Sequence, residues 1–187
     1  DIWGGEVVER RLAGDDLTEL RSIAGAMLER ADVTVVTGGA SVGERDHGKE
    51  VFAPYGLDML FSKVALKPGK PVWIGRCGEK YVVGLPGNPT SAMVTARLLL
   101  APLLAALVGR PWRAALAWRR LVIVGELKPD PMREHFPRAR MEGDLAVLLT
   151  CQDSGLQKPL APADLLVRAS TVQTGDDGRP SGLCLDF

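Results

Sequence analysis

Two glycine-rich turns, each placed directly after an apolar strand, are the parts of this sequence best suited to chemistry. The first covers residues 37–46 (Thr-Gly-Gly-Ala-Ser-Val-Gly-Glu-Arg-Asp), and the second covers residues 84–91 (Gly-Leu-Pro-Gly-Asn-Pro-Thr-Ser). Turns of this kind bring backbone N–H groups close to an anion. In an open α/β sheet, ligands bind at the carboxyl ends of the strands. The two turns therefore predict a single site for a small molecule that carries phosphate.

Two aspartates could contribute to that site. Asp46 ends the first turn, where its carboxylate would meet a bound phosphate, and two anions at one place repel unless a cation lies between them. A phosphate ligand would therefore imply Mg²⁺ beside Asp46; the alternative is a loop aspartate that accepts backbone N–H bonds. Asp15 lies where a strand is expected to meet a helix, and the local sequence favours an N-terminal helix cap.

Three lysines fall within one expected strand, residues 61–67, and the turn that follows it. Lys63 and Lys67 are four residues apart and would share one face of a strand, and Lys70 lies in the turn. Exposed edge strands often carry lysine for solubility alone. Here residues 64–66 are apolar and the strand is expected to be half buried, so inward lysines would need an anionic partner. We favour a bound oxyanion as that partner.

The remaining polar residues are open to ordinary structural explanations. Ser41 and Ser91 lie in the glycine turns and could donate to an oxyanion, but helix capping is the expected role. His47 and His135 are lone histidines without the spacing of metal ligands, and a histidine-based catalytic triad is not indicated. Two residues near the C-terminal end are interpreted as surface residues on local sequence: Arg138 and Ser154.

The first half of the chain alternates between strands and helices. Asp16 with Glu19 resembles a capping box, and the apolar residues between Leu17 and Leu28 recur at the spacing of a helix with one buried face. The continuous apolar run at residues 33–37 is typical of a buried parallel strand. The other elements expected here are strands at residues 5–11, 61–67, 71–75 and 80–85 and a short helix at 49–53.

A second long helix is expected after the second glycine turn. Asn88 can cap it, with Pro89 at its first position. The helix should run to Val108, kink at Pro102, and end in a C-terminal cap at Gly109.

The pattern changes after residues 109–111. The segments that follow are short and separated by Pro, Gly and Asp, which is typical of a small all-β unit. They cover residues 120–126, 138–141, 145–149, 165–169 and 182–185. We place a domain boundary near residues 109–113, which divides the chain into domains 1–110 and 111–187. The expected fold class is α/β, with a three-layer domain around a mostly parallel sheet, followed by a small all-β, barrel-like domain.

Composition narrows the class of protein. The chain has 187 residues and no net charge, with 23 Lys and Arg against 23 Asp and Glu, which argues against nucleic acid as a partner. Three widely spaced cysteines, Cys77, Cys151 and Cys184, indicate neither a zinc site nor a disulfide framework, and reduced thiols suggest a cytoplasmic protein. No run of membrane-spanning length is free of Pro and charge. Because the chain begins with Asp, we expect a piece of a longer protein.

Three strings in this order and spacing resemble the molybdopterin molybdenumtransferases, the MoeA family that includes the gephyrin E domain. They are the two glycine-rich turns, residues 37–46 and 84–91, and residues 66–71 (Leu-Lys-Pro-Gly-Lys-Pro) between them. In the tail, residues 134–138 (Glu-His-Phe-Pro-Arg) and 152–155 (Gln-Asp-Ser-Gly) resemble the family's C-terminal β-barrel domain. The resemblance covers essentially the whole chain and implies a MogA-like three-layer α/β domain.

The resemblance also implies an activity. These enzymes take adenylylated molybdopterin and molybdate, hydrolyse the adenylate and insert molybdenum into the dithiolene, which releases AMP and molybdenum cofactor with the help of Mg²⁺. By motif position, Asp46 and Asp15 would form the acidic pair near the metal and the phosphates. Lys67 and Lys70, with Lys63, would hold molybdate or the pterin phosphate.

Site residues follow from the same resemblance. The catalytic residues would be the acidic pair and the lysines of the Lys-Pro-Gly-Lys turn: Asp46, Asp15, Lys67 and Lys70. The substrate-binding residues would be those of the two turns, the preceding lysine and two residues of the barrel: Gly38, Gly39, Ser41, Lys63, Gly87, Asn88, Pro89, Ser91, Arg138 and Ser154. The last two would extend from the barrel toward molybdate.

The chain departs from the family pattern in two places. The family's N-terminal domains, and the first strand of its α/β domain with a Thr-Gly-Asp-Glu-like segment, are not in this sequence. In relatives the site lies between the α/β domain of one subunit and the N-terminal parts of another, so we expect this chain to bind ligand without full activity. In the barrel, residues 161–165 (Ala-Pro-Ala-Asp-Leu) replace the expected Ala-Asn-Gly.

Two other functions stay open. A MogA-like molybdopterin adenylyltransferase shares the α/β fold, but its first turn typically reads Thr-Gly-Gly-Thr-Gly, whereas residues 40–43 are Ala-Ser-Val-Gly here. A non-catalytic, gephyrin-like binding scaffold is the third possibility. The partners we expect are small-molecule substrates, a second copy of the chain in a homodimer and other proteins of molybdenum cofactor biosynthesis, with no nucleic acid and no membrane.

Overall fold

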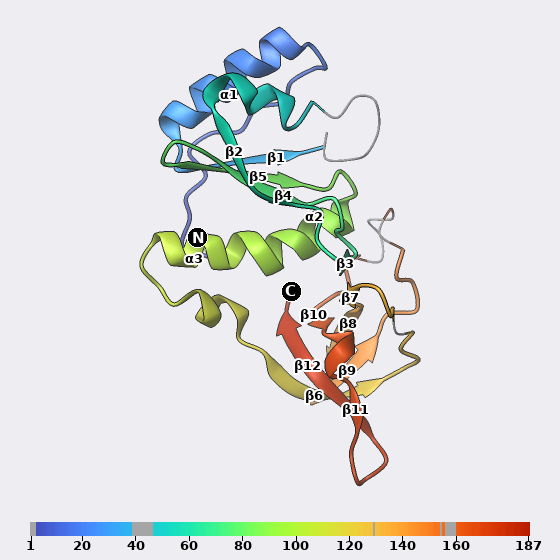
Figure 1. Cartoon of the computed structure of the whole chain (residues 1–187). Coiled ribbons are helices and arrows are strands. Elements are labelled where there is room, and N and C mark those ends of the chain that lie inside the picture. The colour runs from blue at the N-terminus through green and yellow to red at the C-terminus, as the bar shows by residue number, and fades with distance from the viewer. Residues whose placement is uncertain (1–2, 39–46, 129, 154, 156–159) are drawn as a thin grey trace. The chain divides into compact units, whose positions relative to one another are not determined.

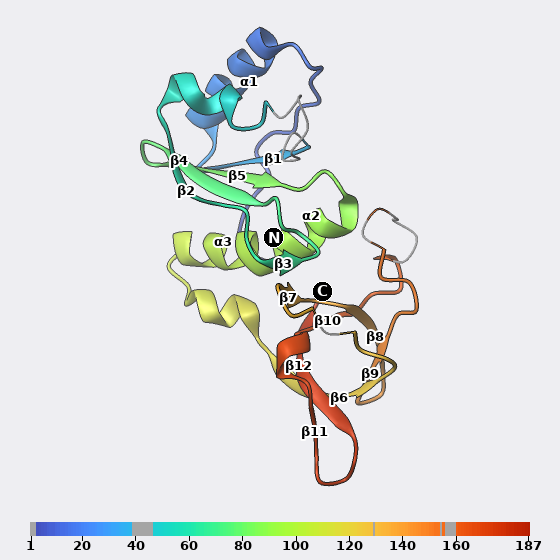
Figure 2. The ribbon, with the colours of Figure 1, turned by 45° about the vertical axis from the view of Figure 1, so that its right-hand side comes forward.

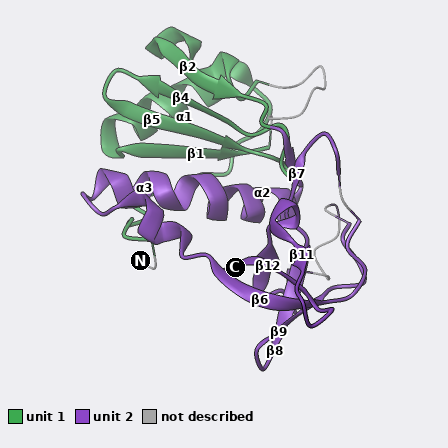
Figure 3. Cartoon of the chain, turned by 60° about the horizontal axis from the view of Figure 1, so that its bottom comes forward, with its two compact units in different colours: residues 1–64, 69–87 green, residues 65–68, 88–187 purple. Residues whose placement is uncertain are grey.

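The structure, a computed structural model, describes residues 3–38, 47–128, 130–153, 155 and 160–187. It divides into two compact units, which Figure 3 shows in different colours. Unit 1 consists of residues 1–64 and 69–87, and unit 2 consists of residues 65–68 and 88–187. The domain boundary expected near residues 109–113 stays a prediction, because compactness alone does not define a domain.

Unit 1 begins with helix α1 (Leu17–Arg30), as the apolar periodicity predicts. Asp16 is the N-cap, and its Oδ1 accepts a hydrogen bond from the Glu19 backbone N–H at 2.8 Å. This bond satisfies one of the N–H groups that have no partner within the helix. Arg30 in the last turn lies near the negative end of the helix dipole.

A four-stranded sheet follows, with the order β1-β5-β4-β2. Its strands are β1 (Val33–Thr37), β5 (Lys80–Leu85), β4 (Trp73–Cys77) and β2 (Leu57–Ser62). Strand β1 is parallel to β5, and the β5–β4 and β4–β2 pairs are antiparallel, so the described sheet is mixed. Helix α1 and the short 3₁₀ helix η1 (Glu50–Tyr55) lie together on one face (Figure 1).

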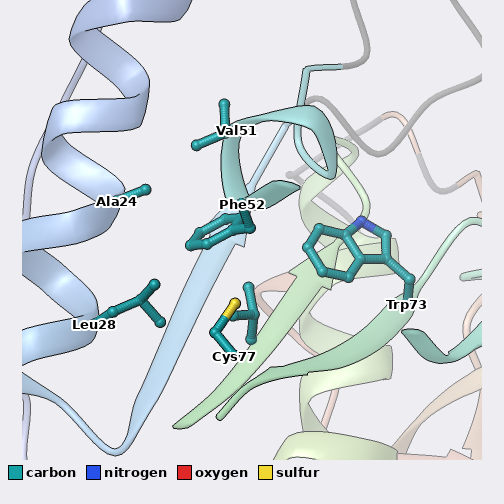
Figure 4. Packing of buried hydrophobic residues seen from close by; sticks show 7 residues of the cluster. Ala24, Leu28, Val51, Phe52, Trp73 and Cys77 are labelled. Carbon is teal, nitrogen blue, oxygen red and sulfur yellow. The ribbon is translucent and has the colours of Figure 1, made fainter. Parts of the chain in front are cut away.

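The core of unit 1 lies between these helices and the sheet (Figure 4). Phe52 of η1 meets Trp73 of β4 edge to face, with ring centroids 6.4 Å apart. Ala24 and Leu28 of α1 pack on the same cluster, together with Cys77 of β4. Large aromatic rings bury the most apolar area per residue, so Phe52 and Trp73 contribute strongly to stability.

Two expectations for the strands are wrong. Residues 5–11 form no strand, because no described strand pairs with them and the side chains of Val7 and Val8 are exposed. Residues 33–37 do form a parallel strand, but not a fully buried one. Within the described sheet β1 pairs with β5 alone, and Val35 is 42% exposed.

The single strand expected at residues 61–67 is also wrong. Strand β2 stops at Ser62, and Lys63 takes a left-handed backbone conformation with φ of 61°. A left-handed residue turns the chain out of the extended path, so Lys63 and Lys67 do not share a strand face. Only Leu66–Lys67 is extended again, as the two-residue strand β3, before the predicted turn at residues 68–71.

Unit 2 contains the long helix predicted after the second glycine turn. It consists of α2 (Pro89–Thr95), a π-helical stretch η2 (Ala96–Leu100) and α3 (Ala101–Leu107) in succession (Figure 1). The π stretch lies immediately before Pro102, whose ring and missing N–H disturb the helical hydrogen bonds at this point. Asn88 is the N-cap and Pro89 the first helical residue, as predicted.

Residues Pro89–Leu107 form a 19-residue helical stretch that is long and apolar enough to cross a membrane by length and composition, with a mean hydropathy of 1.6 over 18 of its residues. Half of that stretch is buried inside the structure, as in the core helix of a compact unit. Its single charged residue, Arg97, donates to the backbone oxygens of Asp186 and Ala115, each at 2.7 Å. The arginine thereby joins the helix to the C-terminal strand and to the 3₁₀ helix η3 (Trp112–Leu116).

The second half of unit 2 is a small barrel. Strand β10 pairs with both β8 and β12, which closes the order β10-β8-β9-β6-β12 into a ring. The strands are β6 (Arg119–Val124), β8 (Arg138–Glu142), β9 (Leu145–Leu148), β10 (Leu165–Val167) and β12 (Pro180–Asp186). They coincide with the five segments predicted from the sequence, and the α/β class with a barrel-like second part is confirmed.

Shorter elements complete unit 2. Strand β11 (Gln173–Thr174) pairs with the start of β12 and forms a hairpin that extends beyond the barrel (Figure 2). Strand β7 (Glu134–His135) pairs in parallel with β3, and the 3₁₀ helix η5 (Ala169–Thr171) precedes β11.

The packing of unit 1 gives a stability prediction. Phe52 is 1% exposed, whereas Phe61 on the edge strand β2 is 37% exposed. We expect Phe52→Ala to lower the free energy of unfolding by about 3–5 kcal/mol, because it leaves a cavity beside Trp73. The control Phe61→Ala should change it by less than about 1 kcal/mol. Urea unfolding measures both, and equal losses would contradict this description of the core.

Candidate functional site

One end of the unit 1 sheet gathers the loops that carry the predicted site. The register pairs Thr37 with Leu85, Gly84 with Trp73, and Trp73 with Ser62. These residues form a row across all four strands. The chain leaves the sheet directly after Thr37, Leu85 and Ser62, and it enters β4 at Trp73. Both glycine turns and the lysine-bearing loop therefore start from the same end of one sheet.

Gly38, at the described start of the first turn, adjoins Gly87 of the second turn at this end. A Cβ added to Gly87 would lie 3.7 Å from the Cα of Gly38, so no side chain separates the two backbones. Gly38 has φ of 84°, a conformation that glycine adopts without strain. Bare backbone in two adjoining turns is the arrangement in which N–H groups can surround an anion.

Gly84, in contrast, has a structural role. A Cβ at this position would lie 2.0 Å from Nε1 of Trp73, so the indole ring packs directly on the glycine backbone. The first glycine of the second turn thus makes room for a core tryptophan, while Gly87 at the end of the turn is exposed.

Lys63 occupies a special backbone position at the end of β2. Among the described residues it is the one non-glycine residue with positive φ, and such residues often lie at functional sites. Its N–H donates to Val72 O at 3.0 Å, and the N–H of Val64 donates to Lys70 O at 3.0 Å. These bonds hold the loop that carries Lys63 and Lys70. Both lysine side chains are exposed, so the expectation of inward lysines is wrong for them.

Asp15 does not cap helix α1, because Asp16 takes that position. Asp15 is exposed, and its carboxylate bonds to no described residue. Helix α1 runs in the opposite direction to β1, which brings its first turn toward the end of the sheet that carries the glycine turns (Figure 1). The capping interpretation is therefore wrong, and the carboxylate is available for another role.

A bound Mg²⁺ needs oxygen ligands, which carboxylates supply. Among the residues that the structure describes, no three His, Cys, Asp or Glu side chains gather into a metal-binding group. Mg²⁺ is usually held by only one or two carboxylates, with water and substrate phosphates completing the shell. The exposed, unpaired Asp15 fits that requirement as one such ligand.

Unit 2 carries the residues that follow the second turn. Asn88 is exposed, and Pro89 lines an open pocket of about 420 Å³ with mainly apolar walls. Ser91 lies inside helix α2, is buried, and accepts a hydrogen bond from Thr95 Oγ1 at its backbone oxygen. Because Asn88 is the N-cap, the capping role expected for Ser91 is wrong.

Lys67 already has an anionic partner within unit 2. Strand β3 pairs in parallel with β7, so Lys67 lies opposite His135, and its Nζ is 3.6 Å from Oδ2 of Asp130. Asp130 is held more tightly by Arg133, whose Nη2 and Nε donate to the same oxygen at 2.7 Å and 3.1 Å. An anionic partner for Lys67 is expected from the sequence, but the structure shows that a carboxylate of the chain itself supplies it.

Arg138 is not a surface residue, contrary to the interpretation of its local sequence. It is 1% exposed, and its Nε has no hydrogen-bond partner among the described residues. Its Nη2 donates only a long bond, 3.5 Å, to Asp153 O. Burial lowers the pKa of its guanidinium, an effect that the nearby Cys151 and Asp153 oppose. A buried cation with so few partners among the described residues is suited to receive an anion.

The second part of the barrel string lies beside Arg138. The backbone N–H of Arg138 donates to Gln152 Oε1 at 2.9 Å, and Gln152 Nε2 donates back to Arg138 O at 2.8 Å. The two tail segments that carry the resemblance, residues 134–138 and 152–155, are therefore in contact. Asp164, in the segment that departs from the family pattern, accepts from the Met141 N–H at 2.8 Å and has a structural role in the barrel.

Several predicted site residues cannot be placed. Those that lie outside the described residues are Gly39, Ser41, Asp46 and Ser154. Three features of the described part escaped the sequence analysis: the left-handed Lys63, the Trp73 ring on Gly84, and Asp130 beside Lys67. The one available signal was the spacing of Asp130 and Arg133, three residues apart, which permits a local ion pair.

The two glycines of the second turn give a matched test. We expect Gly84→Ala to destabilise the protein by about 1–3 kcal/mol, because the added Cβ overlaps the Trp73 ring. Gly87→Ala should change the free energy of unfolding by less than about 0.5 kcal/mol, since the added Cβ would lie at an ordinary contact distance, 3.7 Å, from the Cα of Gly38. Denaturant unfolding of both variants checks this, and a Gly87→Ala variant as unstable as Gly84→Ala would contradict the geometry.

His135 gives a pH dependence. Burial lowers the pKa of its imidazole, with Lys67 and Arg138 acting in the same direction against the Lys128 backbone oxygen and Asp130. The unfolded chain therefore binds the proton more readily, so stability is complete above the ordinary pKa of 6.5 and falls as the pH drops below it.

Unfolding midpoints between pH 7.5 and 5 test this dependence, with the pH values chosen to span about one unit above and more than one below the ordinary histidine pKa. His135→Gln should flatten the decline below the ordinary pKa. The control His47→Gln should keep the wild-type decline, because His135 is still present. A decline unchanged in His135→Gln would show that another group is responsible.

Comparison with known proteins identifies the family of the chain. Residues 2–106 match the family described as "Probable molybdopterin binding domain". Molybdopterin molybdenumtransferase of Haemophilus influenzae is 40% identical over 109 residues, which cover 58% of this chain and 27% of the relative. Molybdopterin molybdenumtransferase 2 of Mycobacterium tuberculosis is 30% identical over 159 residues, which cover 79% of this chain and 37% of the relative.

Solved structures extend the similarity to the barrel. A molybdopterin biosynthesis MoeA protein from Pyrococcus horikosii matches with a TM-score of 0.66 and 27% identity, over 92% of this chain and 41% of that protein. A molybdenum cofactor biosynthesis protein from Pyrococcus furiosus, with a TM-score of 0.69 and 17% identity over 94% of this chain and 56% of that protein, shows the same fold.

The chain is shorter than these proteins, spanning 27% and 37% of the two curated relatives. The family match nevertheless includes more than half of the residues of this chain. It contains both glycine turns and the three candidate lysines, Lys63, Lys67 and Lys70. By that match, and by the barrel that follows it, the chain belongs to the MoeA family of molybdopterin-binding proteins.

Proposed function

We propose that the chain is part of a molybdopterin molybdenumtransferase, which inserts molybdate into adenylylated molybdopterin and releases AMP. The observation that carries this proposal is the pair of adjoining glycine turns, Gly38 and Gly87, at the end of the sheet where Lys63 also emerges. The names of the curated relatives support the same reaction.

In unit 1, the turns would bind the phosphates of the adenylylated pterin through backbone N–H groups. Lys63 and Lys70 would add positive charge, which phosphoanhydride cleavage needs more than it needs covalent chemistry. Gly38 follows β1 and Lys63 follows β2, and these two strands lie three strand spacings apart, or roughly 14 Å. An elongated ligand, such as a pterin joined to an adenylate, is long enough to reach both.

We assign the Mg²⁺ ligands to Asp15 and Asp46. Asp15 is exposed and unpaired among the described residues, and Asp46 takes its role from its motif position. Mg²⁺ bound there would neutralise negative charge on the phosphates. Through the bound ion, the carboxylates would orient the phosphate oxygens relative to the glycine turns.

In unit 2, Arg138 and Lys67 would contact an oxyanion such as molybdate. The guanidinium of Arg138 offers N–H groups in a planar fork that suits a tetrahedral dianion. Its burial excludes water, which strengthens the attraction. Ser154 follows Asp153, whose backbone oxygen accepts from Arg138, and would add a hydroxyl donor.

The adenylyltransferase alternative is less well supported. An enzyme of that kind needs the α/β domain alone, whereas this chain also folds a closed barrel that places Arg138 beside Gln152. Consumption of ATP would favour the adenylyltransferase. A scaffold without activity would tolerate Asp46→Asn, which the transferase would not. We further propose a cytoplasmic homodimer that exchanges its substrates with other proteins of molybdenum cofactor biosynthesis.

A lysine pair tests the proposal. Lys63→Ala, made in the full protein, should lower the rate of molybdenum insertion on the order of 100-fold, because one cationic donor at the phosphates is lost. The control Lys80→Ala removes a lysine from the start of β5, at the opposite end of the same sheet, where it pairs with Asp32 at 2.9 Å. Its rate should match the wild type.

The rate is measured as AMP released and as molybdenum cofactor formed from adenylylated molybdopterin and molybdate. Asp46→Asn should reduce both products by a similar factor, since it removes a metal ligand. Equal rates for Lys63→Ala and Lys80→Ala, or full activity of Asp46→Asn, would contradict the assignment of this end of the sheet as the active site.

A further inference from the structure

Asp130 is held independently of Lys67. Its Oδ2 accepts from Arg133 at 2.7 Å and 3.1 Å, and its Oδ1 accepts from the Met132 N–H at 3.1 Å. The Arg133 hydrogen bonds are the main reason why the pKa of the Asp130 carboxyl lies below its usual value, so the group is anionic at neutral pH. Its position does not depend on the lysine.

The backbone of Lys67 is fixed by hydrogen bonds, whereas its ammonium group is held loosely. The Phe136 N–H donates to Lys67 O at 2.8 Å, and β3 pairs with β7, which fixes the Cα position. Among the described residues, the only partner of the ammonium is Asp130, at 3.6 Å. The Lys67 side chain is 42% exposed, whereas that of Asp130 is 11% exposed. An anion from solution can therefore reach Lys67, but it meets the Asp130 carboxylate on arrival.

We propose that Asp130 is the resident counter-ion of Lys67 and sets the affinity of that lysine for an oxyanion. Lys67, Arg133 and Asp130 together carry a single positive charge, and any anion at Lys67 is repelled by the fixed carboxylate. Asp130 also lines an open pocket of about 330 Å³ with Arg133 and His135, so a small anion can approach this carboxylate from solution. The carboxylate thus weakens binding and speeds release.

This inference rests on the proposed function in one respect, namely that the anion at Lys67 belongs to the substrate. The repulsion itself applies to any small anion. Sulfate and molybdate are tetrahedral dianions of similar shape, so sulfate tests the charge effect alone and molybdate tests it for the proposed substrate.

The experiment is a calorimetric titration of the whole chain with sodium sulfate and with sodium molybdate at low salt. The proteins are wild type, Asp130→Asn, Lys67→Ala and the double variant. We expect Asp130→Asn to bind both anions about fivefold more tightly, which is the order of effect of one unit charge on a dianion about 8 Å away in water. The gain should disappear when Lys67→Ala is added.

A matched control uses the other lysine–aspartate pair. Asp32→Asn removes the counter-ion of Lys80, a 2.9 Å ion pair on unit 1. Because this pair is not part of the proposed anion site, the affinity of the Lys67 site for both anions should stay unchanged. Unfolding curves establish that each variant is folded. Asp130→Ser, which keeps an oxygen for the Met132 N–H, replaces Asp130→Asn if the amide prevents folding.

The outcomes separate this inference from the proposed function. No gain in Asp130→Asn, or a gain that persists without Lys67, overturns the role of Asp130 whatever the activity. A gain for both anions supports it, even where the full protein fails to insert molybdenum, a result that would reject the proposed function alone. Tighter binding with slower turnover in the full protein supports both.

Discussion

The parallel pairing of β1 with β5 is the constraint on which the candidate site depends. Val33 pairs with Tyr81 and Thr37 with Leu85, so two strands that begin almost fifty residues apart in the chain end at the same edge of the sheet. Each strand is followed by a glycine turn, and the register brings Gly38 and Gly87 together. A shift of the register by one residue would separate the turns and reverse the faces of the strands. The Trp73 ring of β4 packs against Gly84 of β5 and thereby supports this register.

Electrostatics distinguish the two units. In unit 1 the lysines of the site are exposed, and Asp15 has no partner among the described residues, so charge is available to a ligand without breaking an ion pair. In unit 2 the cations are constrained: Arg138 is buried, and Lys67 has Asp130 as its neighbour. Desolvation strengthens the attraction of Arg138 for an anion, while Asp130 weakens that of Lys67. The balance between strong binding and release of an anion therefore depends on the burial of Arg138 and on the carboxylate beside Lys67.

Much of the fold could be predicted because the local signals agree with the final structure. The capped helix α1, the turn at residues 68–71, the capped second helix and the five barrel segments all follow from periodicity, Pro and Gly. Long-range effects account for the failures. The left-handed Lys63 ends β2 early, and Val35 is exposed because β1 pairs with one strand only in the described sheet. The burial of Arg138 and the pairing of Lys67 with Asp130 depend on contacts between strands, which spacing along the chain does not encode.

The most direct test of the central claim is calorimetry of the full protein with adenylylated molybdopterin, with and without Mg²⁺, for the wild type and Gly87→Asp. A Cβ fits at Gly87, so this variant should fold while adding a negative charge between the two turns. The account predicts Mg²⁺-dependent binding by the wild type and loss of binding in Gly87→Asp. Binding of equal strength by both proteins would contradict the claim that the adjoining glycine turns hold the phosphates.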